Sequence, residues 1–363
     1  MIPRVTASVD LSALTHNLGV VRRIAPRSRV MAAVKADAYG HGAVPVSRAL
    51  EAAGVDTLAV ACLEEAMALR QARIQAPIAL LEGVMSGEEA AQAVYERLQI
   101  VVHDHWQIDL LERLPTSARL TLWLKLDSGM HRLGFPLTDV PRLRDVLARH
   151  PGWTFAGWMT HLACADEADN AFTREQIVRF ETALSGVPGP RSIANSAGLL
   201  AWPQARVDWV RPGLALYGCS PLPEMPAVSL GLRPAMRLES RLIAVREYAA
   251  GEGVGYGLRY RCPERMRIGV VSVGYADGMH RAFRDGTPAL VRGRRAYLAG
   301  RVSMDMITVD LREVADAAVG DPVLLWGEGL PAEQIATWAD TLSYELFCGL
   351  TQRVRFRYRG APA

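Results

Sequence analysis

The chain has 363 residues, of which half are hydrophobic and 22% are charged, and its formal net charge is +3. A chain of this length exceeds one ordinary hydrophobic core and predicts two domains. Because basic and acidic residues nearly balance, the composition gives no support for binding to nucleic acid or to a membrane surface. No apolar run approaches the roughly 18 residues that a membrane-spanning helix needs, and residues 1–10 lack the apolar segment of a signal peptide. Five scattered cysteines without CxxC spacing argue against a disulfide framework or zinc site and favour a reduced, cytoplasmic protein.

Short apolar segments alternate with amphipathic helical segments through roughly the first 225 residues, as in repeated βαβ units. The expected strands are 29–34, 56–61, 78–81, 100–102, 120–126, 155–160, 191–194 and 209–216. Helix-like segments at 63–73, 87–97 and 173–184 lie between them. Eight such units match a (β/α)₈ barrel of the TIM type. An open doubly wound sheet is the competing topology, although no GxGxxG motif follows the first strand.

The first expected strand ends on Lys35, directly after an apolar run typical of a strand covered on both faces. Lysine is almost never fully buried without a partner. Desolvation lowers an amine pKa and exposes the neutral nucleophile that Schiff-base chemistry requires. Taken alone, the same lysine could equally extend past the strand end into solvent.

Polar side chains follow most of the other expected barrel strands, at the end where barrel enzymes place their active sites. They are Glu82, His103, Lys125, His161, Asn195, Ser196 and Arg211. The loops after strands seven and eight contain small residues whose N–H groups can approach an anion. A phosphorylated aldehyde held there could reach Lys35, and pyridoxal phosphate satisfies both requirements. Arg211 could then meet the pyridine nitrogen, where Asp or Arg is the usual partner.

The pattern changes after residue 228, where strand-like segments follow one another without intervening helices. They are 241–248, 268–273, 289–291, 306–309 and 323–326. One helix is expected over 331–348, and 353–358 alternates like an edge strand. We therefore predict an α/β barrel domain over 1–228 and a smaller, mainly-β C-terminal domain over 229–363.

Five motifs together give the chain a resemblance to the alanine racemases, and a sixth, GRVSMD at 300–305, supports it. The five read VKADAYGHG (34–42), LKLDSGMHRLGF (124–135), ANSAG (194–198), VRPG (210–213) and GYADG (274–278). The resemblance runs over nearly the whole chain. It implies a pyridoxal 5'-phosphate enzyme that interconverts L-alanine and D-alanine and supplies D-alanine for cell-wall synthesis. It also implies a homodimer with shared active sites and no metal.

The resemblance assigns roles to individual residues. Lys35 would form the internal aldimine and act as one catalytic base, and Tyr256 would be the base on the opposite face. The cofactor-binding set would be Lys35, Tyr39, His161, Asn195, Ser196, Arg211, Gly213 and Leu214, and His161 would link Tyr256 to Arg211. Substrate would be bound by Arg132, Tyr275 and Met304. Lys125 is similar to a lysine that is carbamylated in many family members. In the family, Tyr256, Tyr275 and Met304 reach the site from the partner subunit.

One position departs from the family pattern. A tyrosine often precedes an Arg-Val-Pro-Arg stretch near the C-terminus, whereas Gln352 stands at the matching position here and the proline is absent. A polar side chain there leaves open a racemase of serine or of broader amino-acid specificity.

Three other functions compete with this interpretation. A metal-dependent barrel hydrolase could use His103 and His105 with Lys125 and His161, although such enzymes usually carry the HxH motif on the first strand. A pyridoxal-phosphate-binding protein without catalysis would resemble the barrel alone. A barrel-type amino-acid decarboxylase would carry a cysteine-containing acid–base motif in its second domain, and none is found.

Overall fold

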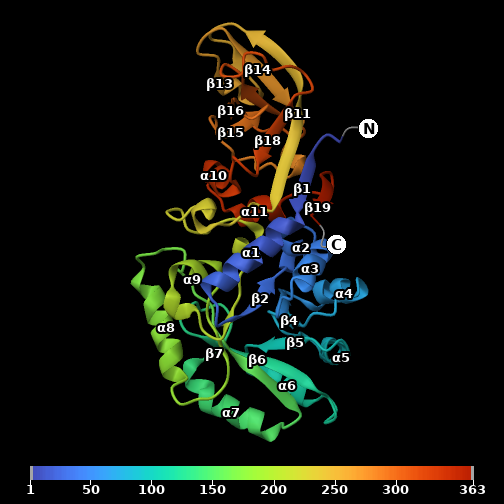
Figure 1. Cartoon of the computed structure of the whole chain (residues 1–363), viewed down its shortest axis with the longest axis vertical. Coiled ribbons are helices and arrows are strands. Elements are labelled where there is room, and N and C mark those ends of the chain that lie inside the picture. Colours follow the sequence, from blue (N-terminus) through green and yellow to red (C-terminus); the bar gives the residue numbers. More distant parts are fainter. Residues whose placement is uncertain (1–2, 361–363) are drawn as a thin grey trace. The chain divides into compact units, whose positions relative to one another are not determined.

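The computed structural model describes residues 3–360, which form two compact units (Figure 1). One unit comprises residues 15–216 and 220–232 and is called the barrel unit below. The other comprises the residues up to Leu14, residues 217–219 and the chain from Arg233 onward, and is called the β unit. Within residues 3–360, none of the helices combines the length and apolarity that crossing a bilayer requires.

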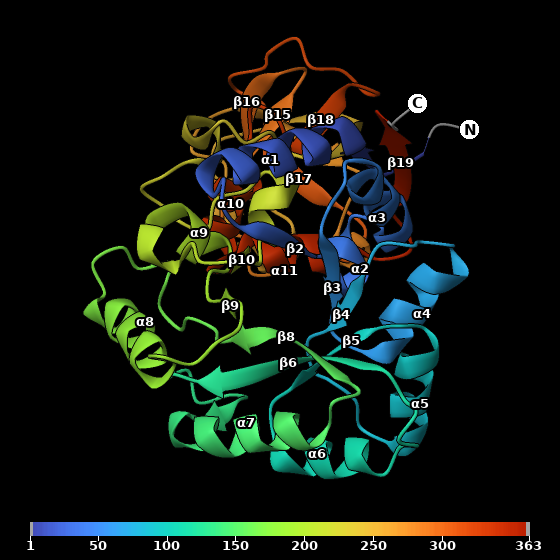
Figure 2. The same cartoon turned by 60° about the horizontal axis from the view of Figure 1, so that its bottom comes forward.

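Eight parallel strands close into a barrel in the barrel unit, which confirms the predicted fold (Figure 2). They are β2 (Arg29–Ala33), β3 (Thr57–Val60), β4 (Ile78–Leu80), β5 (Gln99–Val102), β6 (Leu120–Asp127), β8 (Trp153–Met159), β9 (Arg191–Ser192) and β10 (Trp209–Val210). The pairing of β5 with β6 closes the ring, and a short β7 (Phe135–Pro136) adds to β6. Parallel strands point the same way, so their carboxyl ends meet at one rim.

Helices follow the strands around the outside of the barrel (Figure 2). They are α3 (Ala43–Ala52), α4 (Leu63–Gln71), α5 (Gly87–Tyr95), α6 (His105–Glu112), α7 (Val140–Arg149), α8 (Ala171–Ala183) and α9 (Ser196–Ala201). A longer helix, α1 (Leu11–Ile24), precedes the first barrel strand. Buried side chains, one from each of seven strands, pack together in the barrel interior, among them Met31, Trp123 and Trp209. Trp123 and Trp209 meet edge to face at 5.4 Å, so the interior is packed and the rim is the place left for chemistry.

The eighth strand is shorter than the expected 209–216, and that part of the prediction is wrong. It ends at Val210, and residues Leu214–Tyr217 form a 3₁₀ turn, η3. Pro212 has no N–H to donate to a strand ladder, so the ladder stops there. Its carbonyl instead accepts the N–H of Ala33 at 2.9 Å. The chain therefore turns across the rim after Arg211.

The β unit contains an eight-stranded sheet in the order β14-β17-β16-β15-β18-β11-β1-β19. These strands are β1 (Thr6–Asp10), β11 (Met236–Tyr248), β14 (Met266–Val271), β15 (Pro288–Val291), β16 (Arg294–Leu298), β17 (Ile307–Asp310), β18 (Pro322–Trp326) and β19 (Arg355–Arg359). The long β11 also pairs with β14, so the six strands from β14 to β11 in this order form a closed barrel. A separate hairpin joins β12 (Gly253–Val254) and β13 (Tyr260–Arg261). The mainly-β prediction is confirmed, and β19 is the edge strand expected near the C-terminus.

Two features of the β unit differ from the sequence prediction. The N-terminal strand β1 lies in this sheet, antiparallel to β11 and parallel to β19. The expected single helix over 331–348 is divided into α10 (Ala332–Ala336), a 3₁₀ turn (Thr337–Ala339) and α11 (Ser343–Cys348). The interruption lies at Asp340, whose φ of +53° is left-handed and ends a right-handed helix.

Candidate active site

Lys35 stands at the carboxyl end of β2, where the chain enters an unusual turn. The four residues 36–39 that follow it all have φ between +50° and +53°, so the backbone makes one left-handed helical turn. Left-handed backbone costs an L-residue about 1–2 kcal/mol, and such strain persists only where surrounding contacts impose it. Glu65 accepts the Ala36 N–H at 2.7 Å, and Asp37 accepts the Ala43 N–H at 2.6 Å. The turn thereby holds Lys35 and Tyr39 at fixed positions on the rim.

Beyond this turn lies His41, whose side chain is completely buried. Burial lowers its pKa to about 4, while its Nδ1 lies 2.8 Å from the Tyr39 carbonyl. In the unfolded chain a histidine has a pKa of about 6.5. Between these values the unfolded state binds the proton first, so stability is fully present above pH 6.5 and falls as the pH drops toward 4.

We therefore expect the fold to be less stable at acid pH, because His41 binds a proton more tightly in the unfolded chain. The free energy of unfolding should fall by about 2–3 kcal/mol between pH 7 and pH 4.5 because of this one imidazole. Urea unfolding of wild type and of the non-titrating His41→Gln variant at both pH values measures the difference. An equal loss in the two proteins would show that His41 is not the titrating group.

A polar cradle forms where the loops after β9 and β10 meet the Lys35 turn. Ser196 Oγ accepts the N–H groups of Gly213 at 3.0 Å and Ala215 at 3.2 Å, which leaves its own proton to donate. A Cβ built on Gly213 would lie 2.4 Å from the Tyr39 hydroxyl oxygen, so only glycine permits this approach. Asn195 accepts the Gly198 N–H at 2.8 Å and caps α9. The predicted residues Tyr39, Ser196 and Gly213 are thus brought together, and Leu214 begins the adjoining turn η3.

Arg211 is buried, and its hydrogen-bond partners among the described residues are all neutral. Its guanidinium donates to Ser192 Oγ at 2.6 Å and to the carbonyls of Thr160 at 2.5 Å and Ile193 at 3.2 Å. Burial lowers its pKa to about 10, so it remains charged at neutral pH. The same group lies 3.3 Å from His161 Nδ1.

The contact with Arg211 fixes the state of His161. Burial, together with the positive charges of Arg211 and Lys125, holds the pKa of His161 well below its ordinary value, so the imidazole is neutral. A guanidinium can only donate, so Nδ1 is the acceptor and the ring proton sits on Nε2. That N–H is the polar group which His161 can present to a further partner.

Lys125 lies near the end of β6, where it is buried and has three positively charged side chains near it. Burial and then the charges of Arg211, Arg132 and Lys35 lower its pKa to about 8, while Asp127 opposes the shift. A substantial fraction of this amine is therefore neutral near pH 8. Within residues 3–360, none of these four cations forms an ion pair with a carboxylate. The rim therefore carries concentrated positive charge that an anionic ligand would neutralise.

Two buried glutamines that the sequence analysis missed hold the rim loops together. Gln176 on α8 donates to the His161 carbonyl at 3.2 Å and reaches Ser128 Oγ at 3.5 Å. Gln107 on α6 accepts the His103 N–H at 2.9 Å. Each glutamine interrupts the apolar stripe of its helix, and an amide on a buried stripe must find hydrogen-bond partners. That interruption is the sequence signal that could have revealed them.

The arrangement of the HxH histidines does not favour the metal-dependent hydrolase considered above. His103 Nε2 lies 3.1 Å from the carbonyl of Glu82, and His105 Nε2 lies 2.7 Å from Asp139 Oδ2. The two histidines of the HxH motif therefore have separate partners. Among residues 3–360 there is no group of three His, Cys, Asp or Glu side chains placed to hold a metal ion.

The remaining predicted residues lie in the β unit. Tyr256 lies in a turn between Gly255 and Gly257, both at positive φ, and is 70% exposed. Met304 is 52% exposed and Tyr275 is 39% exposed, on loops that follow β16 and β14. Gln352 is also exposed and lies three residues before Arg355, where β19 begins. Large side chains left in the open on fixed loops are typical of residues that contact something outside their own fold.

The chain has only two lysines, Lys35 and Lys125, and its other 39 basic residues are arginines. Both lysines lie at the rim of the barrel. Amine chemistry in the side chains of this protein is thus confined to the candidate site.

Comparison with known proteins places the chain in a family. Residues 9–221 match the family model of the alanine racemase N-terminal domain, and residues 235–358 match that of the alanine racemase C-terminal domain. A catabolic alanine racemase from Pseudomonas putida is 47% identical, over 98% of both chains. The crystal structure of a biosynthetic alanine racemase from Pseudomonas aeruginosa has a TM-score of 0.95 at 46% identity, covering 99% of this chain and 100% of that one. An alanine racemase from Bartonella henselae, solved with covalently bound pyridoxal phosphate, has a TM-score of 0.90 at 27% identity, covering 99% and 100%. The chain belongs to the alanine racemase family.

Proposed function

We propose that this protein interconverts L-alanine and D-alanine with pyridoxal 5'-phosphate as its cofactor, and supplies D-alanine for cell-wall synthesis. The observation that carries the proposal is the rim of the barrel unit. There Lys35 lies near three other basic side chains, none of which forms an ion pair among residues 3–360, and near a polar cradle at Gly213, as a phosphorylated aldehyde requires. None of the five cysteines forms a disulfide in the described part of the chain, which is consistent with a reducing compartment, and we propose the cytoplasm.

The residues at the rim fit the cofactor at both ends. Lys35 would hold its aldehyde carbon covalently, and the cradle of Tyr39, Ser196 and Gly213, with Asn195 and Leu214 beside it, would hold its phosphate. Arg211 would face the ring nitrogen, and His161 would stand next to it. When bound, pyridoxal phosphate withdraws electrons from the substrate and so acidifies its Cα–H bond. Because a guanidinium stays protonated, Arg211 keeps this withdrawal modest and favours return of the proton to the same carbon.

Racemisation needs one proton-transfer group on each face of the substrate Cα. We assign one face to the Lys35 amine and the other to the Tyr256 phenol of a second copy of the chain. The Nε2–H of neutral His161 is the donor that would hydrogen-bond the phenol oxygen, because Arg211 occupies its Nδ1. A hydrogen bond to the deprotonated oxygen stabilises it and helps Tyr256 to act as a base.

The substrate carboxylate would be bound from two sides. Arg132 supplies a guanidinium from the loop after β6, and Tyr275 and the Met304 N–H would approach from the partner subunit. We therefore propose a homodimer in which domain 1–228 holds the cofactor and domain 229–363 completes the site of the other copy. Those ranges include residues 1–2 and 361–363, which lie outside the described part of the chain.

Lys125 is proposed to carry a carbamate. Its neutral amine would attack CO₂, form an N–C bond and release one proton, which turns the neutral amine into an anion beside three positive charges. In protein equilibrated with ¹³C-bicarbonate at pH 8, we expect one carbamate resonance in the ¹³C NMR spectrum. It should persist in Lys35→Ala and vanish in Lys125→Ala, and its persistence in Lys125→Ala would refute the assignment.

Chiral analysis with a panel of L-amino acids tests the proposed function. Purified protein supplied with pyridoxal phosphate should convert L-alanine to a near-equal mixture of enantiomers. L-serine belongs in the panel because Gln352 places a polar side chain at the position that bears on side-chain selectivity. If no L-amino acid is racemised by cofactor-loaded protein, the proposal fails.

A further inference from the structure

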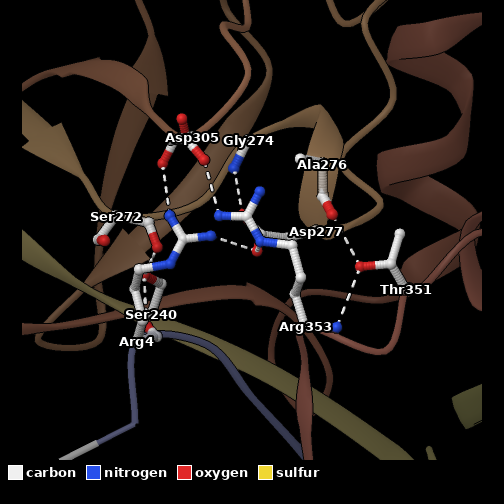
Figure 3. A network of polar contacts seen from close by, with 9 residues as sticks. All are labelled: Arg4, Ser240, Ser272, Gly274, Ala276, Asp277, Asp305, Thr351 and Arg353. Carbon is white, nitrogen blue, oxygen red and sulfur yellow. Dashed lines mark hydrogen bonds and ion pairs between the residues drawn. The ribbon is translucent and has the colours of Figure 1, made fainter.

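We propose that Arg4 and Arg353 are positioning residues for substrate binding. Together with Asp277 and Asp305 they form a charge cluster, which we call the clamp (Figure 3). Asp277 and Asp305 belong to the two loops that carry Tyr275 and Met304. The inference rests on the proposed function, which gives Tyr275 and Met304 their contact with the substrate. It adds that the two termini of the chain set the geometry of that contact.

Strand pairing brings the two arginines together. In the parallel pair β1–β19, Thr6 is opposite Arg355. The Arg355 N–H also donates to the Val5 carbonyl at 3.1 Å. Arg4 and Arg353 each lie two residues before the first pair, so they occupy matching positions on neighbouring strands. Both guanidinium groups approach the Asp277 carboxylate, and both also reach Asp305, Arg353 at its carboxylate and Arg4 at its backbone carbonyl (Figure 3).

Asp277 is the centre of the clamp. Its side chain is only 1% exposed, and its Oδ2 accepts the Gly274 N–H at 2.9 Å. Its Oδ1 accepts a hydrogen bond from the Arg4 guanidinium and lies 3.4 Å from Arg353 Nε. A buried carboxylate needs such compensation, because leaving it unpaired costs far more than pairing it returns. Both arginines are thus tied to the loop of Tyr275.

The same two arginines also reach the loop of Met304. Arg353 donates to Asp305 Oδ1 at 2.7 Å, and Arg4 donates to the Asp305 carbonyl at 2.9 Å. Asp305 directly follows Met304 in the chain. Each guanidinium therefore bridges the two loops, which its planar array of donors permits and the single ammonium of a lysine does not.

Backbone contacts join the two loops into one body. The N–H groups of Tyr275 and Ala276 donate to the carbonyls of Ser303 and Met304, each at 3.0 Å. A Cβ built on Gly274 would lie 2.3 Å from the Met304 carbonyl oxygen, so the loops touch at this glycine. The clamp holds this body against the terminal strands, while the side chains of Tyr275 and Met304 remain exposed at its tip.

The clamp is expected to affect substrate binding and to leave proton transfer unchanged. Tyr275 and the Met304 N–H are proposed to bind the carboxylate, which does not change during proton transfer. Loosening the clamp should therefore weaken binding of substrate and transition state alike, which raises KM and leaves kcat nearly unchanged. A general loss of folding would instead lower the amount of active enzyme and leave KM untouched.

Arg353→Gln is the informative variant, and Arg312→Gln is its control. Arg312 also pairs with two carboxylates of the β unit, Asp310 and Glu264, and has no part in the clamp. We expect KM for L-alanine to rise about tenfold in Arg353→Gln with kcat changed by less than about threefold, since small displacements of positioning groups are costly. Arg353→Lys should recover part of the loss, and Arg312→Gln should leave KM unchanged. The visible absorbance of the bound cofactor should be the same in all four proteins.

Asp305→Asn provides a second test that leaves Asp277 with both arginines. It should raise KM in the same sense, so the proposal remains testable if Arg353→Gln does not fold. The inference is overturned if active wild type and either folded clamp variant have KM values within about twofold, or if the control shifts KM as much. Racemisation by wild type is measured first, so failure of the proposed function is seen separately.

Discussion

Replacement of Lys35 by alanine is expected to lower the racemisation rate at least about 10⁴-fold, because one side chain supplies both the covalent attachment and a proton-transfer group. Lys35→Arg is the matched variant. It keeps the positive charge at the end of β2, but a guanidinium neither bonds to an aldehyde nor gives up its proton at neutral pH. Both variants should therefore be similarly inactive.

The measurement is the rate of D-alanine formation by folded, cofactor-supplied protein, with circular dichroism as the check on folding. Gel filtration in the presence of pyridoxal phosphate should show that the variants lose the visible absorbance that wild type retains. If Lys35→Arg keeps more than about 1% of the wild-type rate, charge and not covalent chemistry would be the role of this residue.

Replacement of Tyr256 by phenylalanine is expected to affect the two enantiomers unequally. Removing the phenol oxygen should slow abstraction of the Cα proton from L-alanine about 10²–10³-fold, while abstraction from D-alanine by Lys35 should fall by less than tenfold. The asymmetry arises because each base serves one face of the substrate. Tyr256 is 70% exposed within its own fold, so the loss of one oxygen leaves the β unit intact.

Single-turnover exchange in D₂O measures each face separately. Loss of the Cα proton is followed by mass spectrometry for each enantiomer under enzyme excess. Tyr95→Phe, at an exposed position with no assigned role, is the control. Equal losses for the two enantiomers would exclude a scheme in which Tyr256 and Lys35 act on opposite faces.

Local sequence patterns were sufficient to predict the barrel. Apolar runs bounded by turn residues identified the parallel strands, because burial on both faces leaves a strong signal in a single segment. The predicted eighth strand is too long because an apolar run continues through Leu214 and Leu216, while Pro212 prevents the strand ladder from continuing. The predicted helix over 331–348 is too long because nothing in its periodicity reveals the left-handed backbone at Asp340.

Non-local features of the fold lay beyond such patterns. The pairing of β1 with β11 and β19 joins segments more than 200 residues apart, and no local period encodes a partner at that distance. The clamp depends on this pairing, so Arg4 could be recognised only once the strands were in register. The left-handed turn after Lys35 was hidden because Ala36 and Ala38 ordinarily favour a right-handed helix.

The residues of the candidate site are easier to predict from the sequence than the residues that hold them in place. Strand ends identified Lys35, Lys125, His161 and Arg211, which the structure gathers on one rim. The protonation state of His161 required the Arg211 contact, and Gln176 required knowledge of which loops meet. Whether Tyr256 and Met304 reach a second copy is a property of the assembly and stays a prediction.

Covalent attachment at Lys35 is the central claim, and borohydride reduction tests it most directly. Reducing cofactor-loaded protein fixes the cofactor to its amine, and peptide mapping then locates it. Only two lysines are present in the chain, so the map is unambiguous. We predict the label on the peptide that contains Lys35 and none on the peptide that contains Lys125. Label on Lys125, or no label on either peptide, would contradict the account.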